Sequence, residues 1–532
     1  MTPPKLAIAS AVALAGALLA APVVYAGGPP PAAASGGAPL SVAVVVGSNH
    51  SPSASLQDLR YGDDDAVQNA RTMAMLGADT TLLVVPDAET RELFPGNKPQ
   101  GPATRAALRA AFDAAKAKVA AARAAGRPTD LYFLFAGHGD TADGRPFLQL
   151  DDAKLWREDL AEMLTSAGAD ANHVVVDACF AAAFVSDRGP GGERDRLPPG
   201  FSRGTRAVWP ARTGFLTARS AGGQTHEWAQ YQAGVFSHEL RSGLMGAADV
   251  DVDGKVTYRE IAAFVRRANE SIPNRRYRPE LSTTPPSGNL DAALAMLPAG
   301  PIVLEMDLQP AGRAFIETET GIRLADLHPA PGAAVKLRLP TDLGGLFVEQ
   351  ETGPNATGNL REFKLAPRAG HVRLSALAAD ASRVAARGAG HEAFMHLFAR
   401  PFDLDAASSF NLEAEDAAEL KWIKQEEDAA RAKTLRKRVA LGAFTVGAVS
   451  GATALGFLLH ANSIAATGTS QLEMRNNDAA AENQRLTSAI LAGVAGGAAL
   501  TGAILLLWPD APNVSVAASP SGETTIAYQR RF

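Results

Sequence analysis

The sequence has very little cysteine and no marked excess of charge of either sign, and both shortages limit what the chain can be. One cysteine among 532 residues excludes any disulfide within the chain, so cysteine usage does not report the redox compartment. The formal net charge of −5 gives no electrostatic reason to expect nucleic acid as a partner. No reliable internal repeat is present. The length allows two or three domains.

The single cysteine stands at the end of a short apolar run. Residues 173–179 read His-Val-Val-Val-Asp-Ala-Cys, so the run ends on Cys179, a potential nucleophile. A second apolar run, residues 131–140, ends in Phe-Ala-Gly-His-Gly-Asp around His138. In open parallel sheets, ligands bind beyond the carboxyl ends of the strands, and about one crossover separates these two runs. The sequence therefore predicts a site that combines Cys179 and His138.

A neighbouring imidazole would make the thiol useful as a nucleophile. A free thiol has a pKa of about 8.5, so only a few per cent of it is thiolate at neutral pH. His138 could accept the thiol proton and help to protonate the leaving amine. Gly139 has no Cβ, so the backbone could approach a substrate closely there, and its N–H and that of Cys179 could hold a developing oxyanion.

These residues resemble the caspase and metacaspase group of cysteine peptidases, in which one strand ends in Gly-His-Gly and a second ends in Asp-x-Cys. The likeness runs from residue 41 to about residue 297, and it includes the segments 59–66 and 234–240. It implies an α/β fold with a caspase-like parallel sheet flanked by helices. It also implies a cysteine endopeptidase of the bacterial cell envelope, acting on protein or peptide substrates.

The resemblance also suggests a substrate pocket. In the metacaspase branch an Asp two residues before the nucleophile, here Asp177, faces a basic P1 side chain, and Asp65 would be a second pocket carboxylate. An alternative for the acidic run 63–65 is the ordinary preference of acids for the first turn of a helix. A legumain- or gingipain-like specificity is the alternative within the same clan.

Apolar runs and helical patterns alternate through the catalytic region. Strands are predicted at about 42–46, 81–85, 131–135, 174–176 and 214–218, and helices at about 63–76, 104–125 and 158–166. Such alternation implies a parallel sheet that is covered on both faces. The peptidase domain is predicted to span 41–298, and it is followed by a small β domain at 300–377 and a charged, helical connector at 378–438.

Both ends of the chain carry apolar segments. Residues 1–26 are typical of a secretory signal peptide, with an uncleaved signal anchor as the alternative, and 27–40 form a linker rich in Gly, Pro and Ala. Residues 439–460 and 489–508 are each long enough to cross a bilayer as a helix, before a tail at 509–532. The alternative for these two segments is a buried, Ala- and Gly-rich hairpin in a soluble domain.

The two topology signals conflict. The signal peptide places residues 27–430 outside the cytoplasm, whereas the basic residues just before the first span favour the cytoplasmic side. Long folded domains translocate largely regardless of flanking charge, so we expect an envelope protein that is anchored in the membrane with its catalytic domain outside.

Residues 249–260, named the acidic loop below, fit the twelve-residue EF-hand pattern. Its expected Ca²⁺ ligands are Asp249, Asp251, Asp253, the carbonyl of Lys255, Thr257 and Glu260. Helical patterns at 236–245 and 259–268 flank it. A solvated turn before a capped helix is the alternative. Calcium is the only cofactor expected, and no organic cofactor is indicated.

Two functions from different classes remain. The first is a cysteine endopeptidase that cleaves after Arg or Lys. The second is an inactive, membrane-held, calcium-binding scaffold, favoured by Phe-Ala-Ala-Ala at 180–183, where the peptidases often have Ser-Gly or Gly-Gly. The arginine-rich stretch 186–213 suits an exposed loop, and we expect self-processing within it.

Overall fold

The fold is that of a computed structural model, in which the chain divides into two compact units, Met1–Phe410 and Asn411–Phe532. The residues that the structure describes are 39–51, 57–142, 145–179, 181, 184, 209–219, 226–274, 277–298, 302–307, 312–340, 342–351, 359–366, 370–379, 381–384, 394, 396–465, 467, 469–507, 513–518 and 524–529. The predicted signal peptide, nearly all of the linker and most of the stretch 186–213 lie outside these ranges.

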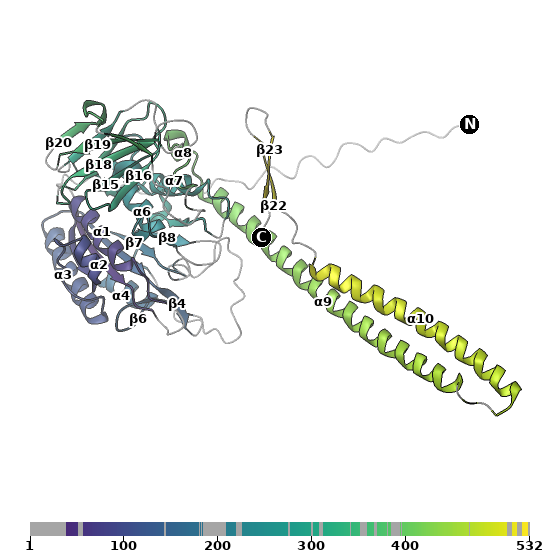
Figure 1. The fold of residues 1–532 in the computed structure, drawn as a ribbon. Helices are drawn as coiled ribbons and strands as arrows, with labels where there is room; N and C mark the ends of the chain where they lie inside the picture. Colours follow the sequence, from purple (N-terminus) through teal and green to yellow (C-terminus); the bar gives the residue numbers. More distant parts are fainter. Residues whose placement is uncertain are drawn as a thin grey trace, which may run out of the picture. The chain divides into compact units, whose positions relative to one another are not determined.

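A six-stranded sheet forms the centre of the first unit (Figure 1), in the order β12-β8-β7-β3-β1-β2. The strands are β1 (Leu40–Ser48), β2 (Asp79–Leu83), β3 (Thr129–Gly137), β7 (Ala171–Asp177), β8 (Thr213–Arg219) and β12 (Glu280–Thr284). The first five are parallel, and β12 pairs antiparallel with β8 at one edge. The sheet is thus rich in parallel strands, as the alternating pattern predicts, with one antiparallel edge strand that the pattern does not predict.

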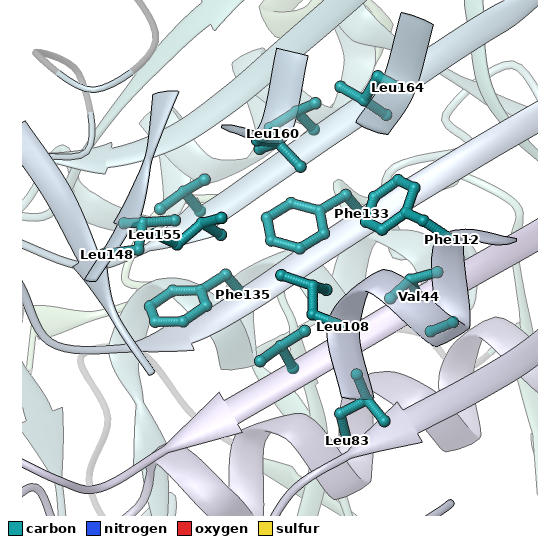
Figure 2. Packing of buried hydrophobic residues seen from close by; sticks show 14 of the residues in the cluster. Val44, Leu83, Leu108, Phe112, Phe133, Phe135, Leu148, Leu155, Leu160 and Leu164 are labelled. Atoms are coloured by element: carbon teal, nitrogen blue, oxygen red, sulfur yellow. The ribbon is translucent and has the colours of Figure 1, made fainter. Parts of the chain in front are cut away.

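Helices cover the sheet. They are α1 (Gly62–Met75), α2 (Ala88–Leu93), α3 (Arg105–Ala124), α4 (Arg157–Ala167), α6 (Val235–Ser242), which continues into the π-helical turn η1 (Gly243–Ala247), and α7 (Tyr258–Asn269). Figure 2 shows Phe133 and Phe135 of β3 gathered with Leu108 and Phe112 of α3 and with leucines of α4. Each fully buried Phe or Leu of this kind contributes about 1.5–3 kcal/mol. This core holds β3 and β7 in place.

Short strands form three small sheets in the segments that connect the main elements. They are β4 (Gly139–Ala142), β5 (Arg145–Gln149) and β6 (Lys154–Trp156) in one ribbon, β9 (Glu227–Trp228) with β10 (Ala233–Gly234), and β11 (Lys255–Thr257) with β13 (Ala293–Met296). The 3-10 turn η2 (Pro286–Gly288) lies between β12 and β13. Two of these strands border the candidate site, since β4 begins directly after His138 and β10 ends directly before α6.

Two small sheets make up the β domain, defined here as residues 302–384. One contains β14 (Ile302–Met306), β17 (Val335–Leu339) and β20 (Gly370–Arg373), and the other contains β15 (Ala314–Thr318), β16 (Arg323–Leu327), β18 (Leu346–Glu351), β19 (Asn359–Leu365) and β21 (Ala381–Val384). The turn η3 (Leu374–Ala376) follows β20, and the short helix α8 (Leu404–Ser408) comes after the β domain. Strand β21 lies in the segment predicted as a charged helical connector, so β structure extends further than the sequence pattern indicates.

A buried ionic network joins the domain of the six-stranded sheet to the β domain. Asp326 of β16 accepts hydrogen bonds from His238 of α6 at 2.9 Å and from Arg323 at 2.9 Å through both carboxylate oxygens. All three side chains are at most 3% exposed. Burial alone would raise the pKa of Asp326, but Arg323 and the hydrogen bond from His238 outweigh that effect and lower it.

The second unit contains two long antiparallel helices, α9 (Leu412–Ala465) and α10 (Gln471–Leu507), and the hairpin of β22 (Asn513–Ala518) and β23 (Thr524–Gln529). Residues 412–438 of the predicted charged connector and the first predicted span form one continuous helix, α9, because nothing in this stretch breaks the helix. The parts of these helices at Arg431–Ala465 and Gln471–Leu507 are long and apolar enough to cross a membrane, with mean hydropathies of 1.6 and 2.2 in their most apolar windows.

Candidate active site

The candidate nucleophile and base follow two neighbouring strands of the central sheet. Strands β3 and β7 pair in parallel, with Ala136 opposite Asp177 near their carboxyl ends. His138 is the first residue after β3, and Cys179 is the second residue after β7. Both therefore leave the same edge of the sheet, the edge at which α/β enzymes bind their substrates.

Gly139 brings the two segments into direct contact. A Cβ atom at this position would lie 2.0 Å from the carbonyl oxygen of Cys179 and 3.2 Å from the Cβ of Ala178. Real Cβ atoms do not approach backbone oxygens so closely, so only glycine fits here. The backbone after His138 consequently packs against the backbone of Cys179.

His138 is oriented by a backbone carbonyl. Its Nε2 lies 3.1 Å from the carbonyl oxygen of Gln57. A carbonyl only accepts, so Nε2 carries the proton in the neutral ring and Nδ1 carries the lone pair. Burial lowers the pKa of His138, while the bond to Gln57 and the charge of Asp58 oppose that shift. A neutral imidazole at neutral pH is the form that a general base requires.

Cys179 is a partly buried cysteine on an anchored segment. Ala178 before it is fully buried, and Ala181 and Phe184 after it belong to the main hydrophobic core, each about 1% exposed. This packing holds the chain as it leaves β7. Three of the four residues of the Phe-Ala-Ala-Ala run, 180, 182 and 183, lie outside the described ranges.

The two carboxylates assigned to the substrate pocket lie close together, on either side of Gly234. A Cβ at Gly234 would lie 2.8 Å from Oδ2 of Asp177 and 3.0 Å from Oδ2 of Asp65. Asp177 accepts from the N–H of Ser237 at 3.1 Å and from its hydroxyl at 2.7 Å. Burial raises the pKa of Asp177, and these two bonds counteract the rise.

Asp65 has a cationic partner within the chain. Arg241 of α6 donates to Asp65 at 2.8 Å, and both side chains are at most 4% exposed. The N–H of Gly234 donates to the other oxygen of Asp65 at 2.7 Å. Burial raises the pKa of Asp65, and the field of Arg241 opposes that rise. Arg241 therefore pairs directly with Asp65, whereas it acts on Asp177 only through its field.

Sequence reasoning did not identify Gln57, Ser237 or Arg241 as contributors to the site. The segment 234–240 is part of the likeness to the caspase and metacaspase group. The roles of its side chains, however, depend on contacts with β7 and α1. Arg241 is 176 positions from Asp65, and no local pattern connects residues at that separation.

The acidic loop follows η1, contains β11 and runs into the first turn of α7. One carboxylate oxygen each from Asp249, Asp251 and Asp253 lies within 4.8 Å of the others. Gly254, at the sixth loop position, has a positive φ of 86°. Glu260 instead accepts from the N–H and hydroxyl of Thr257, both at 2.8 Å. Lys255 pairs with Asp253 through its ammonium group at 2.8 Å.

Comparison with known proteins adds a likeness to solved structures. No protein-family model and no curated protein match this sequence. Among solved structures, the chain is similar to one titled "structure of pro-sf-caspase-1", with 15% sequence identity, a TM-score of 0.27, and coverage of 46% of this chain and 87% of that one. At such a low score the likeness carries no argument of its own, so the site stands on its geometry.

Proposed function

We propose that this chain is a caspase-like cysteine endopeptidase in which Cys179 is the nucleophile and His138 is the general acid and base. The supporting observation is that two adjacent parallel strands deliver an imidazole and a thiol to the same sheet edge. The contact of Gly139 with the carbonyl of Cys179 holds their backbones together.

The proposed reaction follows from the roles of these groups. The imidazole of His138 takes the thiol proton, and the thiolate adds to the peptide carbonyl carbon. Backbone N–H groups of Gly139 and Cys179 hydrogen-bond to the oxyanion. The amine leaves with the proton from the imidazolium, and a thioester remains. Water, deprotonated by His138, then hydrolyses the thioester and restores the thiol.

Reaction with a peptide that carries an electrophile tests this proposal directly. A peptidyl electrophile ending in Arg should modify Cys179 at least about 100-fold faster than it modifies glutathione. A nearby base raises the thiolate fraction by up to about 30-fold at neutral pH, and binding of the peptide places the electrophile beside the thiol. The rival function, an inactive membrane-held interaction protein, rests on the departure at 180–183. That function predicts a rate no faster than that of a free thiol.

We also propose that α9 and α10 hold the protein in a membrane of the cell envelope with the peptidase domain outside the cytoplasm. The support is the length and apolar character of the two helices, together with the predicted signal peptide.

The specificity proposal is cleavage after Arg or Lys, with Asp177 as the recognition group. A charge-assisted hydrogen bond contributes about 2 kcal/mol, or roughly 30-fold in kcat/KM. Asp177→Asn is therefore expected to reduce kcat/KM for an Arg substrate by about 30-fold, with little change for a neutral one. Asp79→Asn, an exposed acid paired with Lys118 at the amino end of β2, is the matched control. A peptide library cleaved mainly after Asp or Asn by the wild-type chain would refute this assignment.

Self-processing is expected within residues 186–213. This stretch carries Arg188, Arg194, Arg196, Arg203, Arg206 and Arg212 among Gly and Pro residues, and it directly follows the nucleophile segment. Loops of such composition are where proteolytic nicking concentrates. The purified wild-type chain should convert to two fragments cut after an Arg in this stretch, whereas Cys179→Ala should stay whole. A wild-type chain that cleaves peptides but stays intact would exclude maturation at this loop.

A further inference from the structure

The acidic loop carries a buried carboxylate oxygen without a hydrogen-bond partner. Asp249 is 1% exposed, and its Oδ1 is buried with no hydrogen bond among the described residues. Its other oxygen accepts only a long bond from the N–H of Gly254 at 3.3 Å. A buried charged oxygen needs a cation or hydrogen-bond donors. This requirement is separate from the twelve-residue pattern, and it points to a bound cation.

The cationic partner of Asp249 comes from the β domain. Nη1 of Arg338, on β17, lies 3.8 Å from Oδ2 of Asp249, and the Arg338 side chain is 9% exposed. The same nitrogen donates to the carbonyl of Lys336 at 2.7 Å. At 3.8 Å the pair is an ion pair without a good hydrogen bond. The guanidinium therefore offsets the charge of Asp249 but leaves Oδ1 unpartnered.

The β domain fits closely against the entry to the loop. Gly246, in the π-helical turn before Asp249, has a φ of 116°, and a Cβ there would lie 2.3 Å from the carbonyl oxygen of Lys336. Residues with a Cβ rarely adopt such a φ, and this one would also meet the backbone of β17. The turn and β17 are thus in fixed contact, which holds Arg338 beside the loop.

We propose that the acidic loop binds one calcium ion and that Arg338 of the β domain is a built-in competitor for the same site. Carboxylates of Asp249, Asp251 and Asp253 and the carbonyl of Lys255 are hard oxygen ligands of the kind that Ca²⁺ prefers. Glu260 would leave its bonds to Thr257 to complete the ligand set. Binding of the ion places positive charge beside Asp249 and so weakens the hold of this carboxylate on Arg338. The calcium state of the loop is thereby linked to the contact between the two domains.

Calcium titration of the detergent-solubilised full chain tests the proposal without any assay of peptidase activity. Isothermal titration calorimetry should show one ion bound to the wild-type chain, and Asp251→Ala should lose that binding. Arg338→Gln should bind calcium about tenfold more tightly, because the substitution removes a close, buried positive charge that repels the ion. The matched control is Arg373→Gln, which removes an exposed arginine of the β domain that pairs with Glu305, and its affinity should equal that of the wild type.

Contrary results are equally definite. Absence of saturable binding up to about 10 mM, roughly tenfold above the weakest dissociation constants of such loops, would overturn the site. Affinity in Arg338→Gln no tighter than in Arg373→Gln would overturn the competitor role. If Arg338→Gln does not fold, hydrogen exchange of the wild-type chain supplies the second measurement. Calcium should change the protection of amides in Val335–Leu339, and unchanged protection there would contradict the link.

Discussion

Cys179→Ala is expected to abolish peptide cleavage, and His138→Ala is expected to lower kcat by about 10³- to 10⁴-fold. Without the thiol no thioester forms, so the loss approaches the roughly 10⁶-fold scale known for removed nucleophiles. Without the imidazole the thiol keeps only its small intrinsic thiolate fraction, and the leaving amine is not protonated. Initial rates on a fluorogenic Arg-containing peptide measure both effects.

The matched control for His138 is His371→Ala, an exposed histidine on β20 in the β domain. Its activity should equal that of the wild type. The double variant Cys179→Ala/His138→Ala should have the same activity as Cys179→Ala alone. When two residues act as one catalytic unit, removal of one already removes most of the activity of the unit. Full activity of Cys179→Ala would rule out this nucleophile.

The pH profile supplies an independent check on His138. Burial lowers the pKa of this histidine from its ordinary value of 6.5. The base must be neutral, so kcat/KM should rise with pH through the lowered pKa and reach its plateau at a lower pH than an ordinary histidine allows. An acid limb centred above 6.5 would contradict the buried imidazole.

The two strands that precede His138 and Cys179 are predictable from the sequence because each contains a short run made only of apolar residues. Residues 131–135 and 174–176 contain no charged residue, as is typical of strands covered on both faces. Each run ends where Gly-His-Gly or Asp-Ala-Cys begins, so the sheet edge places His138 and Cys179 together. Such local features are readable because the strand boundary and the reactive residue are adjacent in the chain.

The partners of the buried charged residues are not predictable in this way. Asp65 faces Arg241, and His238 faces Asp326, across 176 and 88 positions. Each pairing depends on how α6 docks onto α1 and β16, which no hydrophobic period encodes. The full length of α9 is not predicted for a different reason. The sequence changes from charged to apolar residues within this helix, and such a change alters the surroundings of a helix without ending it.

The second large effect is expected at the junction of the two domains, where Asp326→Asn should lower the free energy of unfolding by about 3–5 kcal/mol. The asparagine would leave the guanidinium of Arg323 buried without its main counter-charge, and that is the situation in which breaking an ion pair is most destabilising. Among the carboxylates that the structure describes, Glu317 alone, at 3.3 Å and partly exposed, would remain close to it. Urea titration followed by tryptophan fluorescence reports on this region, because Trp228 packs against Tyr231, which stacks on His238.

Glu319→Gln is the matched control, since this exposed acid of the β domain pairs with the equally exposed Lys364 at the surface, where ion pairs contribute at most about 1 kcal/mol. The pKa of Asp326 is lowered in the folded protein, so its stabilisation is present above the unfolded value of about 3.9 and is lost as the pH falls through the folded value. The difference in the free energy of unfolding between wild type and Asp326→Asn should therefore shrink in acid.

Helix α6 carries both His238 and Ser237, the donor to Asp177, so the same substitution should raise KM for an Arg substrate in the fraction that stays folded. Equal stabilities of the Asp326→Asn and Glu319→Gln variants would show that the buried network does not hold α6 in place.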